Sequence, residues 1–321
     1  MDQTRTPATL RPWLAIVAAF LGGAAMASQA FVNGELGSRI HNGFVAATIS
    51  NTAGIVLVSL IAVAVPEVRA GFATLASSIR AKKVPWFFTL AGALGGFYVT
   101  SQGLFVTLVG IASFTVALIA GTSIGSVLID MWGIGPAGRR APTPRRLIGA
   151  VMGVVAVAIA DSGRFDEPTS MWLLIIPFVI GFGVSWQQAL NGRVSVAAGN
   201  VMTATYLNFL VGTVIMLVFV VIAAPEVGLP AEYPAEWWLY LGGPLGVLFV
   251  TLTSLTIRTV GVLVFTLIAT LGQLSAALTF DFLFPGRADG LAVVIGVVIM
   301  AVAIVIATDR RGLQPTSISR S

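Results

Sequence analysis

The chain has 321 residues, of which 57% are hydrophobic and only 10% are charged, and its mean hydropathy is +0.95. This composition excludes a water-soluble globule, because a chain with so few polar residues cannot cover its apolar surface in water. The net charge of +5 does not indicate a nucleic-acid partner, because Arg and Lys stand at the ends of apolar runs and not in one patch.

Residues 1–12 are short and precede an apolar run that is too long for the core of a signal peptide, so we expect that run to be a retained span. The chain has no cysteine, which excludes disulfides and thiolate metal sites. The abundance of Ala, Gly and Val, and the preference for Arg over Lys, are typical of a GC-rich bacterial source.

Apolar runs near the roughly 20 residues that a membrane-spanning helix needs occupy almost the whole chain. We expect an all-α integral membrane protein with ten transmembrane helices. The fifth is short for a hydrocarbon layer, and the tight joints at Gly110 and around Arg258 predict antiparallel hairpins. The expected spans are Trp13–Val32, Phe44–Val65, Val84–Val109, Ile111–Met131, Leu147–Ala160, Met171–Leu190, Val201–Ala224, Trp237–Ile257, Val260–Phe284 and Gly290–Thr308.

The basic residues predict the orientation of these spans. With the N-terminus inside, fifteen Arg and Lys residues fall in cytoplasmic segments and only Arg39, Arg164 and Arg287 fall outside. This bias predicts a multi-pass protein of the bacterial plasma (inner) membrane with cytoplasmic tails at 1–12 and 309–321.

An internal repeat divides the chain into residues 13–163 and 164–308. Gln29-Ala30-Phe31-Val32-Asn33-Gly34 returns as Gln187-Gln188-Ala189-Leu190-Asn191-Gly192, in the first span of each half. Because each half holds five spans, an odd number, the second half is expected to be inverted relative to the first, as in many secondary transporters. Further matches are Gly54 with Gly212, Pro66-Glu67 with Pro225-Glu226, Leu90–Gly95 with Leu241–Gly246, Phe114-Thr115 with Phe265-Thr266, and Asp130 with Asp281.

These features together resemble a known family. Two five-span halves, each with a glutamine and asparagine stretch and with Ile129-Asp130-Met131-Trp132-Gly133 or Phe280-Asp281-Phe282 at the end of the fourth span, are similar to the YdcZ-type inner-membrane exporters of the drug/metabolite transporter superfamily. The resemblance covers residues 13–308 and implies two fused units. Small multidrug-resistance relatives use a membrane-embedded glutamate in the first helix, whereas Glu35 here lies at the span's edge.

The repeated amides are the first candidates for solute binding. Gln29 and Asn33, like Gln187 and Asn191, are four residues apart and share a helix face, and Gln188 is adjacent. Polar residues inside a membrane usually face a pathway, but the same amides could instead join helices by hydrogen bonds. Both interpretations stay open, and the recurrence in both halves favours solute contact.

A second polar set extends the candidate site. Tyr98, Gln102, Asn208 and Gln273 carry polar groups that reach beyond their own helix, unlike most threonines, which bond back to their backbone. We therefore expect them to help line a cavity between the halves.

Asp130 and Asp281 are the only carboxylates within apolar runs. Each stands at the end of a span, where water can solvate it or a nearby arginine can pair with it. If buried, either could instead take part in proton coupling.

Other motifs are rejected. Gly133-x-Gly135-x-x-Gly138 has dinucleotide-fingerprint spacing but follows an apolar helix and is interrupted by Pro136. The single histidine, His41, leaves no parts for a Ser-His-Asp triad or a histidine metal site, and no Walker-type sequence occurs. We expect no cofactor, no metal and no enzyme activity.

The sequence therefore predicts a secondary transporter that moves a small metabolite or drug-like solute outward by alternating access, as a monomer or homodimer. A lipid or amphiphile flippase, with a groove open sideways to the bilayer, is one alternative. A non-transporting membrane scaffold is another.

Overall fold

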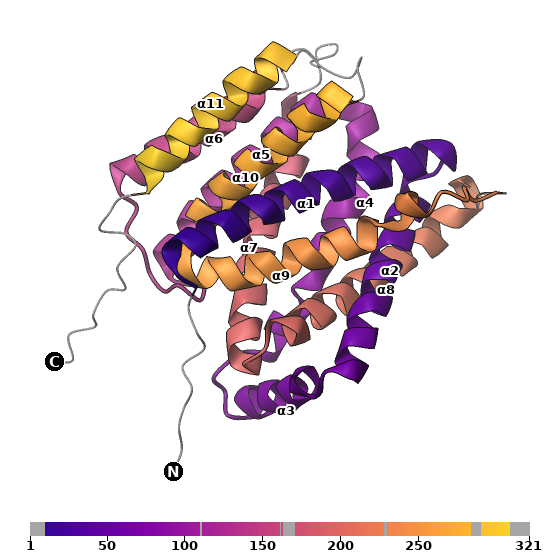
Figure 1. The fold of residues 1–321 in the computed structure, drawn as a ribbon, viewed down its shortest axis with the longest axis vertical. Coiled ribbons are helices and arrows are strands. Elements are labelled where there is room, and N and C mark those ends of the chain that lie inside the picture. Colours follow the sequence, from indigo (N-terminus) through magenta and orange to yellow (C-terminus); the bar gives the residue numbers. More distant parts are fainter. Residues whose placement is uncertain are drawn as a thin grey trace.

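The computed structural model describes residues 10–109, 111–160, 162, 171–227, 230, 232–283 and 290–308. Its regular structure is helical, and no strand occurs within these ranges (Figure 1). The long helices are α1 (Pro12–Arg39), α2 (Gly43–Ala64), α3 (Pro66–Arg80), α4 (Gly92–Val109), α5 (Ile111–Trp132), α6 (Pro144–Ala160), α7 (Ile175–Ala198), α8 (Val201–Val227), α9 (Gly242–Val260), α10 (Val262–Leu283) and α11 (Gly290–Ala307), with short 3₁₀ turns η1 (Trp86–Leu90), η3 (Met171–Leu174) and η4 (Trp237–Tyr240).

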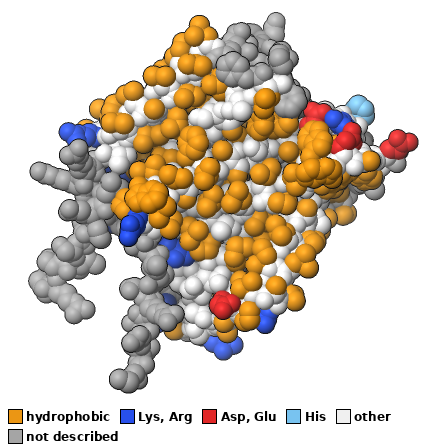
Figure 2. All heavy atoms as spheres, in the orientation of Figure 1, with side chains coloured by type: hydrophobic (Ala, Val, Ile, Leu, Met, Phe, Trp, Pro, Cys, Tyr) orange, Lys and Arg blue, Asp and Glu red, His pale blue; other side chains and the backbone are white. Residues whose placement is uncertain are grey.

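Membrane-spanning length is reached by seven helices of the described chain, against the ten spans expected from the sequence. These seven are α1, α2, α5, α7, α8, α9 and α10, while the apolar part of α11, Leu291–Ala307, is shorter. The short fifth span corresponds to α6, which has 17 residues. The surface agrees with a membrane protein: Figure 2 shows a broad apolar band between charged side chains at opposite edges of the face.

One helix falls outside the expected spans. α3 begins with Pro66 and Glu67 and ends with Arg80, which suits the polarity of a helix dipole. Its buried face packs against α7 and α8, where Thr203 Oγ1 donates to the Val68 carbonyl at 2.9 Å. The sequence analysis did not predict this helix, because its 15 residues are fewer than a membrane span needs, although Val68, Phe72, Leu75 and Ile79 recur at helical spacing.

α1 is held between two helices of the second half. Its packing against α9 is antiparallel: Gly22 contacts Leu252, and Gln29, further along α1, lies at Gly246. Its packing against α10 is parallel, since Gly23 lies on the Ala269 backbone and Phe31 stacks on Phe280 with ring centroids 4.6 Å apart.

α7 packs against α5 of the first half as α1 packs against α10 of the second half. Gly181 lies on the Leu118 backbone of α5, and Gly121 lies on the Phe178 backbone of α7. Ser185 Oγ also donates to the Thr122 carbonyl at 2.7 Å. Glycines at these crossings allow the helix backbones to approach closely.

α2 and α8 cross near the middle of the molecule and run antiparallel. Asn51 Nδ2 donates to Thr213 Oγ1 at 2.7 Å, and Gly54 faces the Phe209 ring. α2 runs parallel to α9, since Ser50 lies at Gly242 and Gly243, and Val58, further along α2, shares a buried cluster with Val247 of α9.

These contacts fix the relative direction of the two amide-bearing helices. α1 is antiparallel to α9, α9 runs with α2, and α2 is antiparallel to α8. α8 in turn is antiparallel to α7, to which it is joined by a short turn at Gly199, where φ is +65°. α1 and α7 therefore run in opposite directions.

α3, α6 and α11 lie at the periphery (Figure 1). Figure 1 shows α6 and α11 side by side at one edge and α3 at the opposite edge. Gly149 lies against Ala307 and Gly296 against Ala160, so α6 and α11 are antiparallel.

The joint between α9 and α10 differs slightly from the sequence expectation. Arg258 lies inside α9, and the chain turns at Gly261, where φ is +83° and a side chain would be strained. The joint expected at Gly110 lies outside the described residues.

Candidate functional site

Three amide side chains meet where α7 faces α8. Asn208 Oδ1 accepts hydrogen bonds from Gln187 Nε2 at 2.9 Å and from Asn191 Nδ2 at 2.8 Å. Asn191 and Asn208 are buried. We call Gln187, Asn191 and Asn208 the Gln187 cluster; it unites three of the residues that the sequence selected.

The corresponding residues of α1 form a second group with a different partner. Asn33 Oδ1 and Ser50 Oγ both lie close to Gly242 of α9, and neither has a hydrogen-bond partner in the described part of the chain. We call Gln29, Asn33 and Ser50 the Gln29 cluster. The sequence analysis missed Ser50, although the match of Gly54 with Gly212 makes Ser50 the equivalent of Asn208 in the internal repeat.

Each cluster packs on glycines of the other half of the chain. A methyl group at Gly246 would lie 2.6 Å from Gln29 Nε2, and one at Gly95 would lie 2.5 Å from Gln187 Nε2. The sequence match of Leu90–Gly95 with Leu241–Gly246 makes these two contacts equivalent. Both glutamines therefore occupy space that only glycine leaves free.

The backbone contacts below the clusters are also equivalent. Gly92 of α4 lies on the carbonyl of Asn208, and Gly243 of α9 lies on the carbonyl of Ser50. The two clusters are linked through the α2 and α8 crossing, where Asn51 Nδ2 also donates to the Phe209 carbonyl at 3.2 Å. Amide and hydroxyl groups thus line α1, α2, α8 and α7, and glycines of α9 and α4 pack against them.

The other expected solute contacts lie apart from these amide and hydroxyl groups. Tyr98 packs beside the buried Phe114 and Leu118. Gln273 is half-buried on α10, and none of the described contacts joins it to the amides. Gln188 is buried, and its Oε1 atom lacks a partner among the described residues. The side chain of Gln102 lies outside the described part of the structure.

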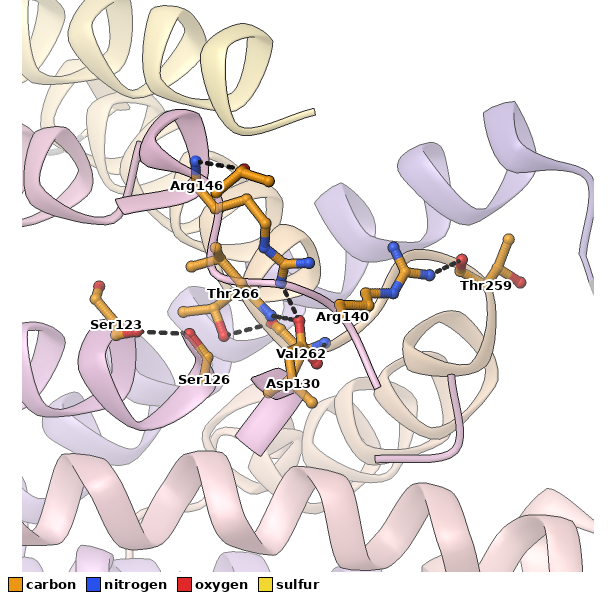
Figure 3. A network of polar contacts seen from close by, with 10 residues as sticks. Ser123, Ser126, Asp130, Arg140, Arg146, Thr259, Val262 and Thr266 are labelled. Carbon is orange, nitrogen blue, oxygen red and sulfur yellow. Dashed lines mark hydrogen bonds and ion pairs between the residues drawn. The ribbon is translucent and has the colours of Figure 1, made fainter. Parts of the chain in front are cut away.

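Asp130 occupies a junction between the halves (Figure 3). It is 1% exposed, so the expectation of a water-solvated carboxylate is wrong. Its oxygens accept from the backbone N–H groups of Val262 at 2.9 Å and Leu263 at 3.2 Å, and it forms an ion pair with Arg146. The expected arginine partner is therefore confirmed, and Asp130 caps the first turn of α10.

A second arginine borders this junction. The Arg140 backbone N–H donates to the Asp130 carbonyl at 2.7 Å, and its guanidinium donates to the Thr259 carbonyl at 2.9 Å. Burial lowers the pKa of Arg140, the charge of Asp130 raises it, and the charge of Arg146 lowers it. The junction joins α5 and α6 of the first half to α9 and α10 of the second. The side chain of Asp281 lies outside the described residues.

The helix ends carry two further charged contacts. Arg193 of α7 donates to the carbonyls of Ile134 and Gly133 at 2.7 and 2.8 Å. Arg258 of α9 donates to Ser195 Oγ of α7. Sequence reasoning used both arginines only as orientation signals, because a single basic residue at a span end carries no sign of its tertiary partner.

The described surface also has two apolar grooves. One, of about 490 Å³, is lined by Ile49, Thr52, Ala53, Val56, Leu57 and Leu60 of α2. The other, of about 300 Å³, lies between α1, α10 and α11 and is lined by Ile16, Val17, Phe20, Leu21, Ile268, Leu271, Ala301 and Ile304. Neither includes a residue of the two amide clusters. No group of three or more His, Cys, Asp or Glu side chains that could hold a metal occurs among the described residues.

Comparisons with known proteins agree with this architecture. The family model described as "Putative inner membrane exporter, YdcZ" matches the chain twice, over residues 14–159 and 172–306. One solved crystal structure has the same fold with a TM-score of 0.54 at 15% sequence identity, covering 93% of this chain and 97% of the other. No curated protein matches the chain in sequence. The two matched segments cover most of the sequence, and the chain therefore belongs to the YdcZ family of inner-membrane exporters, as a multi-pass membrane protein consistent with two fused family units.

Proposed function

We propose that the chain is a secondary transporter that exports a small metabolite or drug-like solute across the bacterial plasma membrane by alternating access. In this proposal ten spans form two inverted five-helix repeats, residues 13–163 and 164–308, and both termini are cytoplasmic. The chain works as a monomer or homodimer. Membership of an exporter family supports the class of activity.

One observation carries the proposal: each half inserts a glutamine into a glycine gap of the other half. Gln29 lies at Gly246 and Gln187 lies at Gly95, on helices that run in opposite directions. Equivalent contacts on opposite sides of an inverted repeat can open alternately, which is the basis of alternating access.

The amides have a defined role in this cycle. In the present state the Gln187 cluster is closed by its own hydrogen bonds. A solute that offers donors and acceptors replaces these bonds when the seam opens, so that the buried amides stay satisfied. Gln29, Asn33, Gln187, Gln188, Asn191 and Asn208 are the proposed solute contacts, with Tyr98, Gln102 and Gln273 as outer members.

The driving force is proposed from the carboxylates. Asp130 is engaged by two backbone N–H groups and Arg146, and we propose that it serves as a structural junction and not as the coupling group. Asp281 stays the other candidate for coupling. Exchange or facilitated diffusion fits a transporter in which neither aspartate takes part in coupling.

The test is a flux assay on the purified chain in proteoliposomes, preceded by a thermal-shift screen of metabolites and drugs to find a solute. Gln29→Ala combined with Asn191→Ala is expected to reduce solute flux at least tenfold. The matched control is Thr279→Ala, which removes an exposed polar group bonded only to its own helix at the Ser275 carbonyl. Unchanged flux in a folded double variant, with lowered stability in detergent, would contradict transport through the amides and favour a scaffold.

The lipid-facing grooves favour one second candidate, an amphiphile flippase. Both grooves are apolar: one lies on α2, and the other lies between α1, α10 and α11. Uptake of a fluorescent amphiphile from the bilayer and not from water, blocked by Ala53→Trp in the α2 groove, would support it.

A further inference from the structure

Arg258 is placed unlike the other interior arginines. It is half-buried in the last turn of α9, and its guanidinium donates to the hydroxyl of Ser195 on α7. Its Nε atom is buried without a partner in the described chain. Arg146, by contrast, pairs with Asp130, and Arg193 is satisfied by two carbonyls.

Two more unpartnered polar atoms lie on the same helix faces. Ser254 precedes Arg258 by one turn of α9, is 0% exposed, and has no hydrogen-bond partner for its hydroxyl among the described residues. Gln188 precedes Ser195 by two turns on the same face of α7, and its Oε1 is likewise unpartnered. We call Gln188, Ser195, Ser254 and Arg258 the α7–α9 seam.

The chemistry of the seam is that of an anion site. Partial burial of the Arg258 guanidinium, with its Nε atom buried, favours a partner that carries negative charge. The planar fork of arginine matches a carboxylate or phosphate, and serine hydroxyls can donate to the same oxygens. An arginine that only complements the end of α9 would bond its carbonyls, whereas the described partner of Arg258 is the hydroxyl of Ser195.

We infer that the α7–α9 seam binds the carboxylate or phosphate group of an anionic solute, with Arg258 supplying the charge and Ser195 and Ser254 supplying hydrogen bonds. This inference rests on the proposed transport function and names the class of its substrate. The phosphate of an anionic lipid headgroup has the same chemistry, so the test must separate the two sources.

The experiment measures thermal unfolding of the purified full chain in neutral detergent. Inorganic phosphate and succinate are titrated against sodium chloride at equal ionic strength. Wild type is compared with Arg258→Gln, Arg258→Lys and the control Arg69→Gln. Arg69 is exposed and bonds only backbone carbonyls near the end of α2, including that of Ala62 at 3.2 Å.

Phosphate or succinate is expected to raise the unfolding midpoint of wild type and Arg69→Gln. The apparent Kd should rise about tenfold or more in Arg258→Gln, because this variant removes the charged member of the proposed ion pair. Arg258→Lys should retain part of the shift. If Arg258→Gln does not fold, Ser195→Ala with Ser254→Ala is expected to weaken the same titration while keeping the charge.

The inference would be overturned if phosphate or succinate shifted the unfolding midpoints of wild type and Arg258→Gln equally. It would also be overturned if neither anion shifted the wild-type midpoint more than sodium chloride does. Nanodiscs of phosphatidylcholine with and without phosphatidylglycerol separate the sources: stabilisation by phosphatidylglycerol alone, dependent on Arg258, would overturn the solute assignment in favour of a headgroup. Flux of a neutral or cationic solute that survives Arg258→Gln would overturn the anion assignment while transport stands. Arg258-dependent phosphate binding without flux through the amides would leave the seam standing and remove the proposed transport function.

Discussion

The Gln187 cluster and the Gln29 cluster share a backbone frame but differ in their side-chain bonding. In both, a glutamine packs against a glycine of the other half of the chain. A second glycine lies on the backbone carbonyl of Asn208 in the Gln187 cluster and of Ser50 in the Gln29 cluster. Asn208 accepts two hydrogen bonds from its cluster, whereas Ser50 Oγ and Asn33 Oδ1 have no described partner. One substitution between the repeats, serine for asparagine, accounts for this difference.

The comparison separates two roles that the repeat combines. Glycine contacts set how closely the helices approach, and this is common to both clusters. The residue at the Asn208 or Ser50 position sets whether the amides are held to one another. We therefore expect the Gln187 cluster to be the more resistant to opening and the Gln29 cluster to be the more available to solute.

The largest effect is expected from the shared backbone frame. Gly92→Ala and Gly243→Ala each place a methyl group against backbone atoms, which cannot move aside without separating the helices. Each should lower the free energy of unfolding by about 3 kcal/mol, measured by SDS titration in mixed micelles. Gly34→Ala is the control, since nothing lies within 4 Å of its added methyl group. A large loss in only one of the two variants would break the equivalence of the frames.

The side chains should then separate the clusters. Asn208→Ala leaves two amide donors without their acceptor and should lower the free energy of unfolding by about 2 kcal/mol. Ser50→Ala removes a hydroxyl that has no described partner and should change it by less than about 0.5 kcal/mol. The same SDS titration measures both. Similar losses in the two variants would contradict the comparison.

A smaller difference is expected at the glutamines. Gly95→Ala and Gly246→Ala both press on a flexible side chain, which can shift. Displacing Gln187 also strains its bond to Asn208, so Gly95→Ala should destabilise by about 1–2 kcal/mol and Gly246→Ala by less than about 1 kcal/mol. Thermal unfolding midpoints in one detergent rank the pair. The reverse ranking would show that Gln29, and not Gln187, is the more firmly held.

The smallest effect concerns the end of the molecule beyond the Gln29 cluster. Arg39 pairs with Glu35 at 3.1 Å and with Glu236 at 2.6 Å. The pKa of Glu236 is lowered by a hydrogen bond from the backbone N–H of Glu236 to its own carboxylate and by the hydrogen bond from Arg39. A carboxylate whose folded pKa is lowered stabilises the fold above its unfolded pKa of about 4.3 and loses this contribution as pH falls through the folded value.

The unfolding midpoint of wild type should therefore exceed that of Glu236→Gln slightly at neutral pH, and the difference should disappear in acid. Glu67→Gln on α3 is the control for the loss of a carboxylate elsewhere. A difference between wild type and Glu236→Gln that grows in acid would contradict the assigned ion pair.

Sequence reasoning succeeded where the signal was local or periodic. Long apolar runs predicted the all-helical membrane protein. The repeated Gln-x-x-x-Asn stretch identified Gln187 and Asn191, and the search for long polar side chains within spans identified Asn208, which the structure brings together with them. α3 was missed although Val68, Phe72, Leu75 and Ile79 recur at helical spacing, because its 15 residues are fewer than the membrane spans that were sought. Sequence reasoning failed where a tertiary partner decides. For Asp130 the sequence left solvation by water and pairing with an arginine as alternatives, because the N-terminus of α10 that it caps is 132 residues away in the chain.

By itself the sequence determined that this chain is membrane-embedded, helical and built from two related halves, because hydropathy and repetition are properties of neighbouring residues. Only the tertiary structure decided which amides are bonded, which partner each interior arginine has and which glycines admit a side chain from the other half. Those outcomes depend on contacts between helices far apart in the chain. Gln187 and Asn191 both donate to Asn208, whereas Asn33 Oδ1 and Ser50 Oγ, at the equivalent places of the first half, have no described partner.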